Sequence, residues 1–145
     1  MDEKEYLKSR LDDQIAWYDQ KSKFNQRMYK RLVLIEILFS VSIPFLTSFV
    51  NDELLTIKII IGIIGVGIAV IAGIMNLYKF HENWINYRTT SETLKHEKYL
   101  FLTKSGIYRE EKSLDTPYNN LVTRIEMIIS KENTNWQQKL NKKEK

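Results

Sequence analysis

The sequence contains no cysteine, and its 145 residues include only two histidines and two prolines. Without cysteine there is no disulfide and no thiolate to bind a metal or act as a nucleophile. His81 and His96 lack metal-pair spacing, and no carboxylate cluster surrounds them. No glycine-rich phosphate loop is present, and no Ser or Thr stands near a His and an acid as a nucleophile requires. We therefore expect no enzyme, no metal site and no cofactor.

Charged residues are scarce in the middle of the chain, residues 32–78, and crowd both flanks. This segregation hides a membrane pattern behind a slightly negative mean hydropathy of -0.35. The net charge of +4 is compatible with nucleic-acid binding. Basic residues beside apolar spans are explained more simply by membrane orientation and contact with anionic lipids, so we expect no nucleic-acid partner. Residues 1–5 are polar and acidic, which predicts an uncleaved signal anchor rather than a cleaved signal peptide.

Two apolar runs, residues 32–50 and 59–77, are each long enough to cross a bilayer. At 1.5 Å per residue each run spans about 28 Å, close to the ~30 Å hydrocarbon core. Residues 59–68 are apolar on all sides, as lipid contact requires. The short link, residues 51–58, forces the two spans into an antiparallel hairpin.

The charges beside the spans predict the orientation of the hairpin. The link carries two acids and one base, whereas bases dominate both flanks: Lys21, Lys23, Arg27, Lys30 and Arg31 before the first span, and Lys79, Arg88, Lys95 and Lys98 after the second. The positive-inside rule therefore places both termini in the cytoplasm and the link outside. Tyr29, Tyr78 and Trp84 stand where an inner aromatic belt is expected.

Both spans are predicted to continue as cytoplasmic helices, residues 1–31 and 78–104, that pack together. Each carries an apolar stripe with steps of three or four residues. The stripes are Leu7, Leu11, Ile15, Tyr18, Ser22, Asn25, Tyr29 and Leu32 in the first arm, and Phe80, Trp84, Tyr87, Ser91, Leu94 and Phe101 in the second. Gly106 is expected to end the second arm, and Pro117 to open a docked helix over residues 116–138. The predicted fold is a single all-α domain, residues 1–145: an integral membrane protein with a two-helix transmembrane hairpin, long cytoplasmic extensions and a docked C-terminal helix.

Glu36 is the ionisable residue inside the first span. Ser40, Thr47 and Ser48 follow on roughly the same helix face. One hypothesis is that these residues line a water-filled path, where a carboxylate favours cations. The alternative is that Glu36 reaches headgroup water or a neighbouring base, and that the hydroxyls bond to their own backbone.

In the second span, Gly65, Ala69 and Gly73 recur every four residues, and small residues at this spacing let helices approach closely. They pack either within one hairpin or between subunits. Asn76 is expected to add an interfacial hydrogen bond. Asp52 and Glu53 either form an outer, cation-attracting mouth in a ring of subunits or are simply part of a solvated turn.

Residues 82–95 contain the pattern W-x-x-Y-R-T-T-x-E-x-L-K, which continues in residues 97–108, and residues 13–19 and Trp136-Gln137 also fit. Over nearly its whole length the chain resembles the SLATT group of two-transmembrane bacterial proteins, in particular a branch catalogued only as a domain of unknown function. The resemblance implies a bacterial inner-membrane effector in conflict systems, which forms a pore after a cytoplasmic cue from a sensor or nucleotide signal.

In the family-like segment, Arg88 and Glu92 are spaced as an i,i+4 ion pair. Together with Trp84 and Tyr87 they are expected to form a buried network that locks the two cytoplasmic arms, and contact with an anion or nucleotide is the alternative. Two functional hypotheses follow. The first is a homo-oligomeric, cation-permeable channel or pore, gated from its cytoplasmic helices. The second is a non-conducting membrane scaffold that recruits a cytoplasmic partner.

Overall fold

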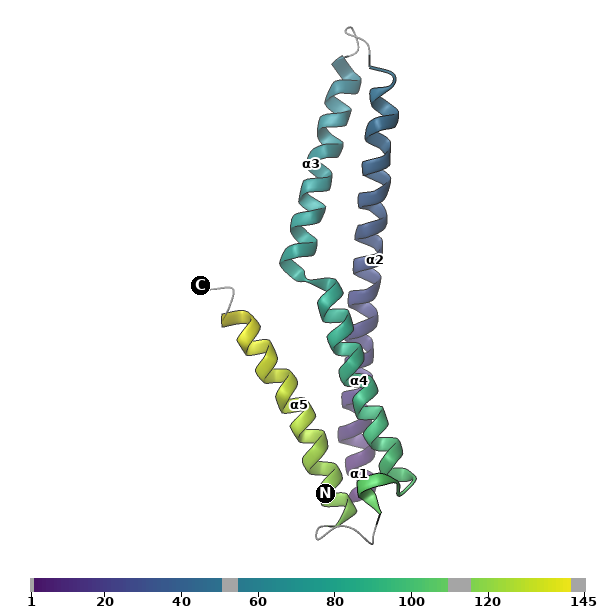
Figure 1. Ribbon diagram of the computed structural model, residues 1–145, viewed down its shortest axis with the longest axis vertical. Coiled ribbons are helices and arrows are strands. Elements are labelled where there is room, and N and C mark those ends of the chain that lie inside the picture. The colour runs from purple at the N-terminus through teal and green to yellow at the C-terminus, as the bar shows by residue number, and fades with distance from the viewer. Residues whose placement is uncertain (1, 51–54, 110–115, 142–145) are drawn as a thin grey trace. The chain divides into compact units, whose positions relative to one another are not determined.

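The computed structural model describes residues 2–50, 55–109 and 116–141, and every regular element in these ranges is helical (Figure 1). The elements are α1 (Glu3–Glu5), the π-helical η1 (Tyr6–Asp12), α2 (Asp13–Thr47), α3 (Leu55–Tyr78), α4 (Phe80–Leu102), the 3₁₀ turn η2 (Gly106–Tyr108) and α5 (Pro117–Asn141). They fall into two compact units. Unit 1 comprises Met1–Ser22 and Ile85–Lys145, and unit 2 comprises Lys23–Trp84.

The N-terminal helix is continuous from Glu3 to Thr47, as the unbroken sequence predicts. The Asp2 carboxylate caps its start by accepting a hydrogen bond from the Glu3 N–H at 2.7 Å. Pro44 lies inside α2 without ending it. The helix stops at Thr47, three residues before the predicted end of the first span, and a turn follows in which the Val50 N–H bonds to the Thr47 carbonyl at 3.2 Å.

The second long helix is broken at Lys79, which corrects the prediction of an uninterrupted run (Figure 1). Lys79 has φ of 50°, the left-handed conformation usual for a residue that follows a helix. Its N–H bonds to the Met75 carbonyl at 2.9 Å. The Asn83 side-chain amide donates to the Tyr78 carbonyl at 3.0 Å. The break was missed because lysine occupies a position where glycine is the usual signal.

The C-terminal end of α4 is also formed around a lysine. Lys104 has φ of 49°. The Ser105 N–H bonds to the Leu100 carbonyl at 2.9 Å and the Lys104 N–H to the Phe101 carbonyl at 3.0 Å, which together make a Schellman motif. The predicted stop at Gly106 is thus close to the real one. Pro117 opens α5 as expected, and α5 extends three residues beyond the predicted 138.

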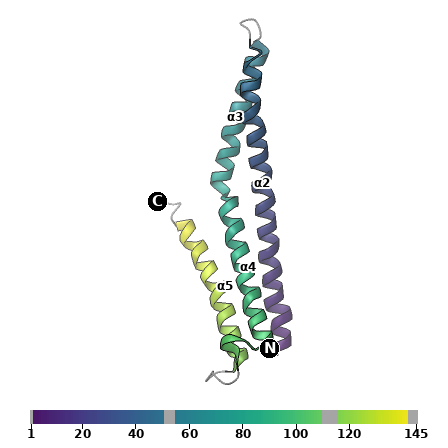
Figure 2. The ribbon, with the colours of Figure 1, turned by 45° about the vertical axis from the view of Figure 1, so that its right-hand side comes forward.

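Unit 1 is built around one core to which η1, α2, α4, η2 and α5 contribute. The hydrophobic residues with no exposed surface are Leu11, Leu94, Tyr108, Leu121 and Ile125, and Ser91 is also fully buried. The predicted stripes of the two arms supply Leu11, Tyr18, Tyr87 and Leu94 of this core, and Tyr118, Val122 and Ile128 of α5 pack against it. The N-terminus, the end of α4 and the start of α5 lie at the same end of the unit (Figure 2). The predicted packing of the arms and docking of the last helix are therefore present in this unit.

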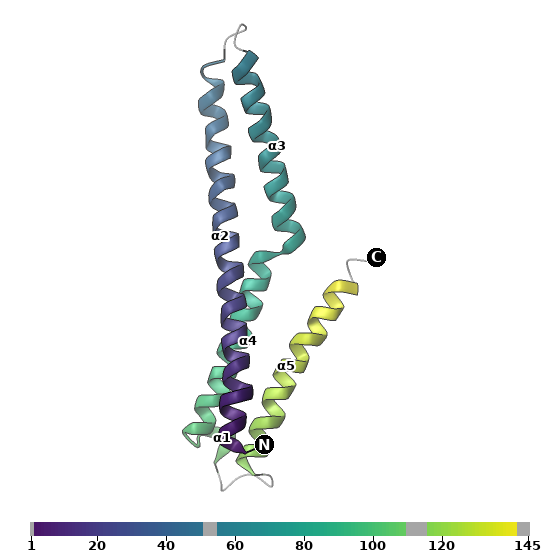
Figure 3. The ribbon, with the colours of Figure 1, turned by 180° about the vertical axis from the view of Figure 1, so that it is seen from behind.

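Unit 2 is a hairpin in which α3 runs beside the C-terminal part of α2 (Figure 3). α3 has 24 residues and none of them is buried. It lies in the one stretch of the described chain that is long and apolar enough to cross a membrane. α2 does not meet the same test, because a bilayer-length window ending at Thr47 includes Lys30, Arg31 and Glu36.

Candidate functional site

Glu36 lies on α2 at the edge of the half-buried face of the hairpin. That face is formed by Leu32, Phe39, Ile43 and Leu46, which follow the helical repeat on either side of Glu36. In the described chain, no hydrogen bond or ion pair joins the Glu36 carboxylate to another residue. Large apolar side chains surround it, including Ile37, which is 53 % exposed. The hairpin thus holds one carboxylate within an apolar surface.

The hydroxyls grouped with Glu36 are occupied by backbone hydrogen bonds. Ser40 Oγ donates to the Glu36 carbonyl at 2.8 Å. Thr47 Oγ1 donates to the Pro44 carbonyl at 2.9 Å and Ser48 Oγ to the Phe45 carbonyl at 2.6 Å. The last two bonds satisfy carbonyl groups near the end of α2 that lack a partner within the helix. Ser40, Thr47 and Ser48 are exposed, whereas Glu36 is half-buried, so the four residues do not form one uniform surface.

The small residues of α3 lie away from the contact with α2. A Cβ added at Gly65 or Gly73 would meet no atom within 4 Å. Ala69 and Asn76 are exposed on the same side. The glycine that serves the hairpin is Gly67, which we had not singled out: a Cβ there would lie 3.0 Å from Cε2 of Phe39. Gly67 therefore admits the Phe39 ring, and the stripe of Gly65, Ala69 and Gly73 remains open.

Aromatic and basic side chains gather where the hairpin meets the first turn of α4. The Tyr29 ring lies 4.8 Å from that of His81, and the His81 ring 5.7 Å from that of Trp84. The Lys30 ammonium lies 5.9 Å from the centre of the Trp84 ring. Tyr78 stacks on Phe80 at 5.5 Å. The three residues predicted for the inner aromatic belt thus all lie in this unit, close to Lys79.

Arg88 and Glu92 form the predicted ion pair, at 3.1 Å, but both are about half exposed. Asp19 extends the network, because its carboxylate lies 3.9 Å from Arg88 and 3.6 Å from Lys95. Tyr87 is buried beside Tyr18, with ring centres 6.1 Å apart. The arms of unit 1 are therefore joined by an aromatic contact inside and a charged network at the surface, where we had expected the charged network to be buried.

The strongest polar links in unit 1 are two Tyr–Glu–Arg triads that hold α5. In the first, Tyr6 Oη donates to Glu126 Oε1 at 3.1 Å, and Arg10 binds the same carboxylate through both oxygens at 3.0 and 2.9 Å. In the second, Tyr108 Oη donates to Glu97 Oε2 at 2.5 Å, and Arg124 binds Glu97 at 2.9 and 2.5 Å. Such bidentate pairs fix geometry as well as adding energy. One triad joins α5 to η1 and the other joins α5 to α4.

Hydrogen bonding and burial shift the pKa values of the triad residues. The hydrogen bonds from Arg124 hold the pKa of the Glu97 carboxyl below its usual value against the opposing effect of burial. Arg10 does the same for the pKa of Glu126. Burial, followed by the hydrogen bond to Glu97, raises the pKa of Tyr108. Both carboxylates are therefore charged, and the tyrosines neutral, at ordinary pH.

Neither triad was predicted from the sequence. Glu97 continues the stripe between Leu94 and Phe101, so a polar residue at a core position was a signal that could have been used. The residues of the other triad lie 116 positions apart, Arg10 to Glu126. No local spacing reveals that pair.

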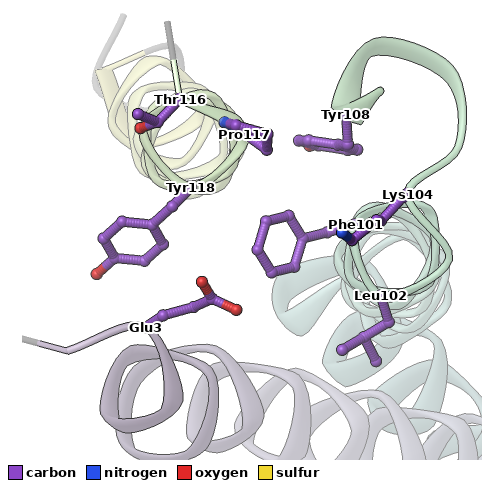
Figure 4. Close-up of a pocket in the computed structure, with 8 residues that line it drawn as sticks. All are labelled: Glu3, Phe101, Leu102, Lys104, Tyr108, Thr116, Pro117 and Tyr118. Atoms are coloured by element: carbon purple, nitrogen blue, oxygen red, sulfur yellow. The ribbon is translucent and has the colours of Figure 1, made fainter. Parts of the chain in front are cut away.

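A pocket of about 440 Å³ opens at the end of unit 1 (Figure 4). The rings of Phe101, Tyr108 and Tyr118 stand around it, and the Glu3 carboxylate points toward it from α1 (Figure 4). Its other lining residues are Leu102, Lys104, Thr116 and Pro117. The lining combines one acid, one base and aromatic surface, without a nucleophile–base pair.

No group of three His, Asp or Glu side chains able to hold a metal occurs in the described ranges. Asp52 and Glu53, assigned to an outer mouth, lie outside the described residues.

Comparison with known proteins gives a family match over most of the chain. No curated protein and no solved structure matches the sequence. A family model described as "Protein of unknown function (DUF4231)" matches residues 13–116, well over half of the chain. The match covers both helices of the hairpin and all of α4. The chain therefore belongs to this family of proteins of unknown function, DUF4231.

Proposed function

We propose that the chain is a multi-pass inner-membrane protein whose α2/α3 hairpin assembles with other copies into a cation-permeable pore. The observation that carries the proposal is Glu36, a carboxylate without a described partner on a hairpin whose outer face is apolar. Val41, Phe45, Ile63 and Val66 on that face are each more than 60 % exposed. An apolar surface of this extent calls for lipid or another subunit. An ionisable residue within it is a candidate part of an ion path.

Insertion of both α2 and α3 with the termini in the cytoplasm is part of the proposal. The absence of buried residues from α3 supports it, since the core helix of a soluble protein would be mostly buried. The basic flanks support the orientation. Membership of DUF4231 is compatible with the SLATT resemblance, which supplies the idea of an effector gated by a sensor or nucleotide signal.

Homo-oligomerisation is required because two helices cannot enclose a path. The open stripe of Gly65, Ala69 and Gly73 supports contact between subunits rather than within the hairpin, where Gly67 already fills that role. The first test is the mass of the purified protein in mild detergent or nanodiscs, after subtraction of bound detergent and lipid. A defined ring of four or more chains is expected. A monomer or dimer would refute the pore.

The second test measures currents through the reconstituted protein. Glu36→Gln removes the charge at constant size, and we expect it to lower the cation-to-anion permeability ratio. Ser40→Ala is the matched control, because its hydroxyl already serves the helix backbone. Unchanged selectivity in Glu36→Gln would remove this carboxylate from the ion path.

The competing function is a non-conducting scaffold that recruits a cytoplasmic partner. The network of Asp19, Arg88, Glu92 and Lys95 favours it, because these charged side chains lie partly exposed on unit 1. A stable ring that passes no current under any condition, together with a partner lost in Arg88→Ala, would support the scaffold.

A further inference from the structure

Four basic residues of unit 2 share one face of α2. Lys23, Arg27, Lys30 and Arg31 follow spacings of four, three and one, which place them within about a third of the helix circumference. All four are exposed. The opposite face of the same segment is the packed one, with Asn25 buried. The basic face therefore points outward from the hairpin.

This face is electrostatically unbalanced. Arg27 has Lys30 three residues away and Arg31 four residues away, and like charges at these spacings destabilise a helix. In the described chain, no carboxylate lies within ion-pair distance of Arg27, Lys30 or Arg31. The contact recorded for Arg27 is with the Lys23 carbonyl, at 3.3 Å. An anion bound here would relieve the repulsion.

The surroundings of the basic face indicate which anion it suits. The face ends where the apolar part of α2 begins, at Leu32. The Lys30 ammonium lies against the Trp84 ring, and Trp84 belongs to the Tyr29–His81–Trp84 cluster. Aromatic rings beside cations, one turn from an apolar helix, are typical of the headgroup level of a bilayer. The phosphate of a lipid meets both requirements, because its acyl chains continue along the apolar surface.

We propose that Lys23, Arg27, Lys30 and Arg31 form a binding site for the headgroup of an anionic phospholipid in the inner leaflet, with Trp84 beside it. The inference rests on the proposed membrane placement of the hairpin. It goes further, because it assigns a lipid class and a set of ligating side chains. Guanidinium groups form bidentate hydrogen bonds to phosphate oxygens, so Arg27 and Arg31 are the principal contacts.

The test uses Trp84 as the reporter. Trp17→Phe/Trp136→Phe leaves it as the single tryptophan of the full chain. The protein is reconstituted in vesicles of phosphatidylcholine and phosphatidylglycerol with matched acyl chains, one of the two lipids being brominated high on its chains. Bromine quenches tryptophan at contact. The ratio of quenching by the two brominated lipids therefore measures which headgroup occupies the site.

We expect brominated phosphatidylglycerol to be preferred at Trp84 by at least about fivefold, the gain expected from one basic side chain near an anionic surface. Arg27→Gln/Lys30→Gln/Arg31→Gln should bring the ratio close to one. Lys4→Gln/Lys8→Gln/Lys131→Gln removes the same charge from exposed positions of unit 1 and should leave the preference unchanged. Arg27→Lys/Arg31→Lys keeps the charge but loses the bidentate contacts, so the preference should weaken and remain above one even if the neutral variant inserts poorly.

The outcomes separate the lipid site from the membrane placement. Equal quenching by both lipids in the otherwise unaltered protein would overturn the headgroup site and leave the membrane hairpin standing. No quenching by either lipid would place Trp84 away from the bilayer and would also overturn the headgroup site. A preference that the unit 1 control also abolishes would show a general charge effect and overturn the assignment to α2.

Discussion

Arg124 and Arg10 each bind a glutamate that also accepts a hydrogen bond from a tyrosine, but the two carboxylates differ in burial. Glu97 is 3 % exposed, whereas the side chains of Arg10 and Glu126 are both about 40 % exposed. Arg124→Ala leaves a buried charge with only the Tyr108 hydroxyl, which should cost about 2 kcal/mol because Arg124 itself is half exposed. Arg10→Ala should cost about 0.5 kcal/mol, as exposed pairs do.

Thermal unfolding in mild detergent, followed by far-ultraviolet circular dichroism, measures both variants. The two substitutions remove the same side chain, so the loss of helix-favouring arginine is matched. Equal destabilisation by the two variants would contradict the role given to the burial of Glu97.

The same triads predict how the stability of unit 1 depends on pH. The pKa values of Glu97 and Glu126 are lowered in the folded chain. Their contribution is therefore complete above the unfolded value of about 4.3 and is lost as the pH falls through the folded value. The melting temperature should be flat from about pH 5 to 8 and should fall below about pH 4. Glu97→Gln should flatten this acid limb while lowering stability at neutral pH; an unchanged acid limb would exclude Glu97 as its source.

At the level of elements, sequence periodicity predicted the packed faces of the helices more accurately than it predicted the helix ends. The stripes on both arms were visible because core positions repeat every three or four residues. The break at Lys79 was not visible in the sequence. It involves a lysine in the left-handed conformation and a hydrogen bond from the Asn83 side-chain amide, neither of which is a usual sequence signal for the end of a helix. Likewise, the role of Gly67 depends on the Phe39 ring, a contact between helices that spacing alone does not specify.

Substitutions at two glycines of α3 should distinguish the folding of the hairpin from the assembly of subunits. Gly73→Leu meets open space in one chain, so the hairpin should remain folded while the dissociation constant of the oligomer rises at least about tenfold. The side chain introduced by Gly67→Leu collides with Phe39, so this variant should lower the thermal stability of the hairpin before it affects the oligomer. Helix propensity changes equally in both. Detergent-corrected mass and circular dichroism report the two effects, and an intact oligomer in Gly73→Leu would remove this stripe from the subunit contact.

At the level of the whole molecule, α2 and α4 are continuous helices that each contribute to both units. α5 belongs to unit 1 alone and is tied by one triad to η1, which leads into α2, and by the other to α4. Docking of α5 therefore fixes the spacing of the two helices that lead to the hairpin. In the proposed gating, a cue that releases α5 would free both helices at once and would act on the hairpin through them.

A charge exchange tests this route without shortening the chain. Arg10→Glu places two carboxylates against each other and should release α5 from η1. Arg10→Glu/Glu126→Arg exchanges the partners and should restore docking, because both side chains lie at partly exposed positions that tolerate the swap. If docking controls the pore, the current at a fixed protein-to-lipid ratio should change in the single variant and return in the exchange. A current altered equally in both would reflect the loss of Arg10 itself. An unaltered current in a ring of unaltered mass would separate α5 from gating and leave it as the surface on which a scaffold presents its partner.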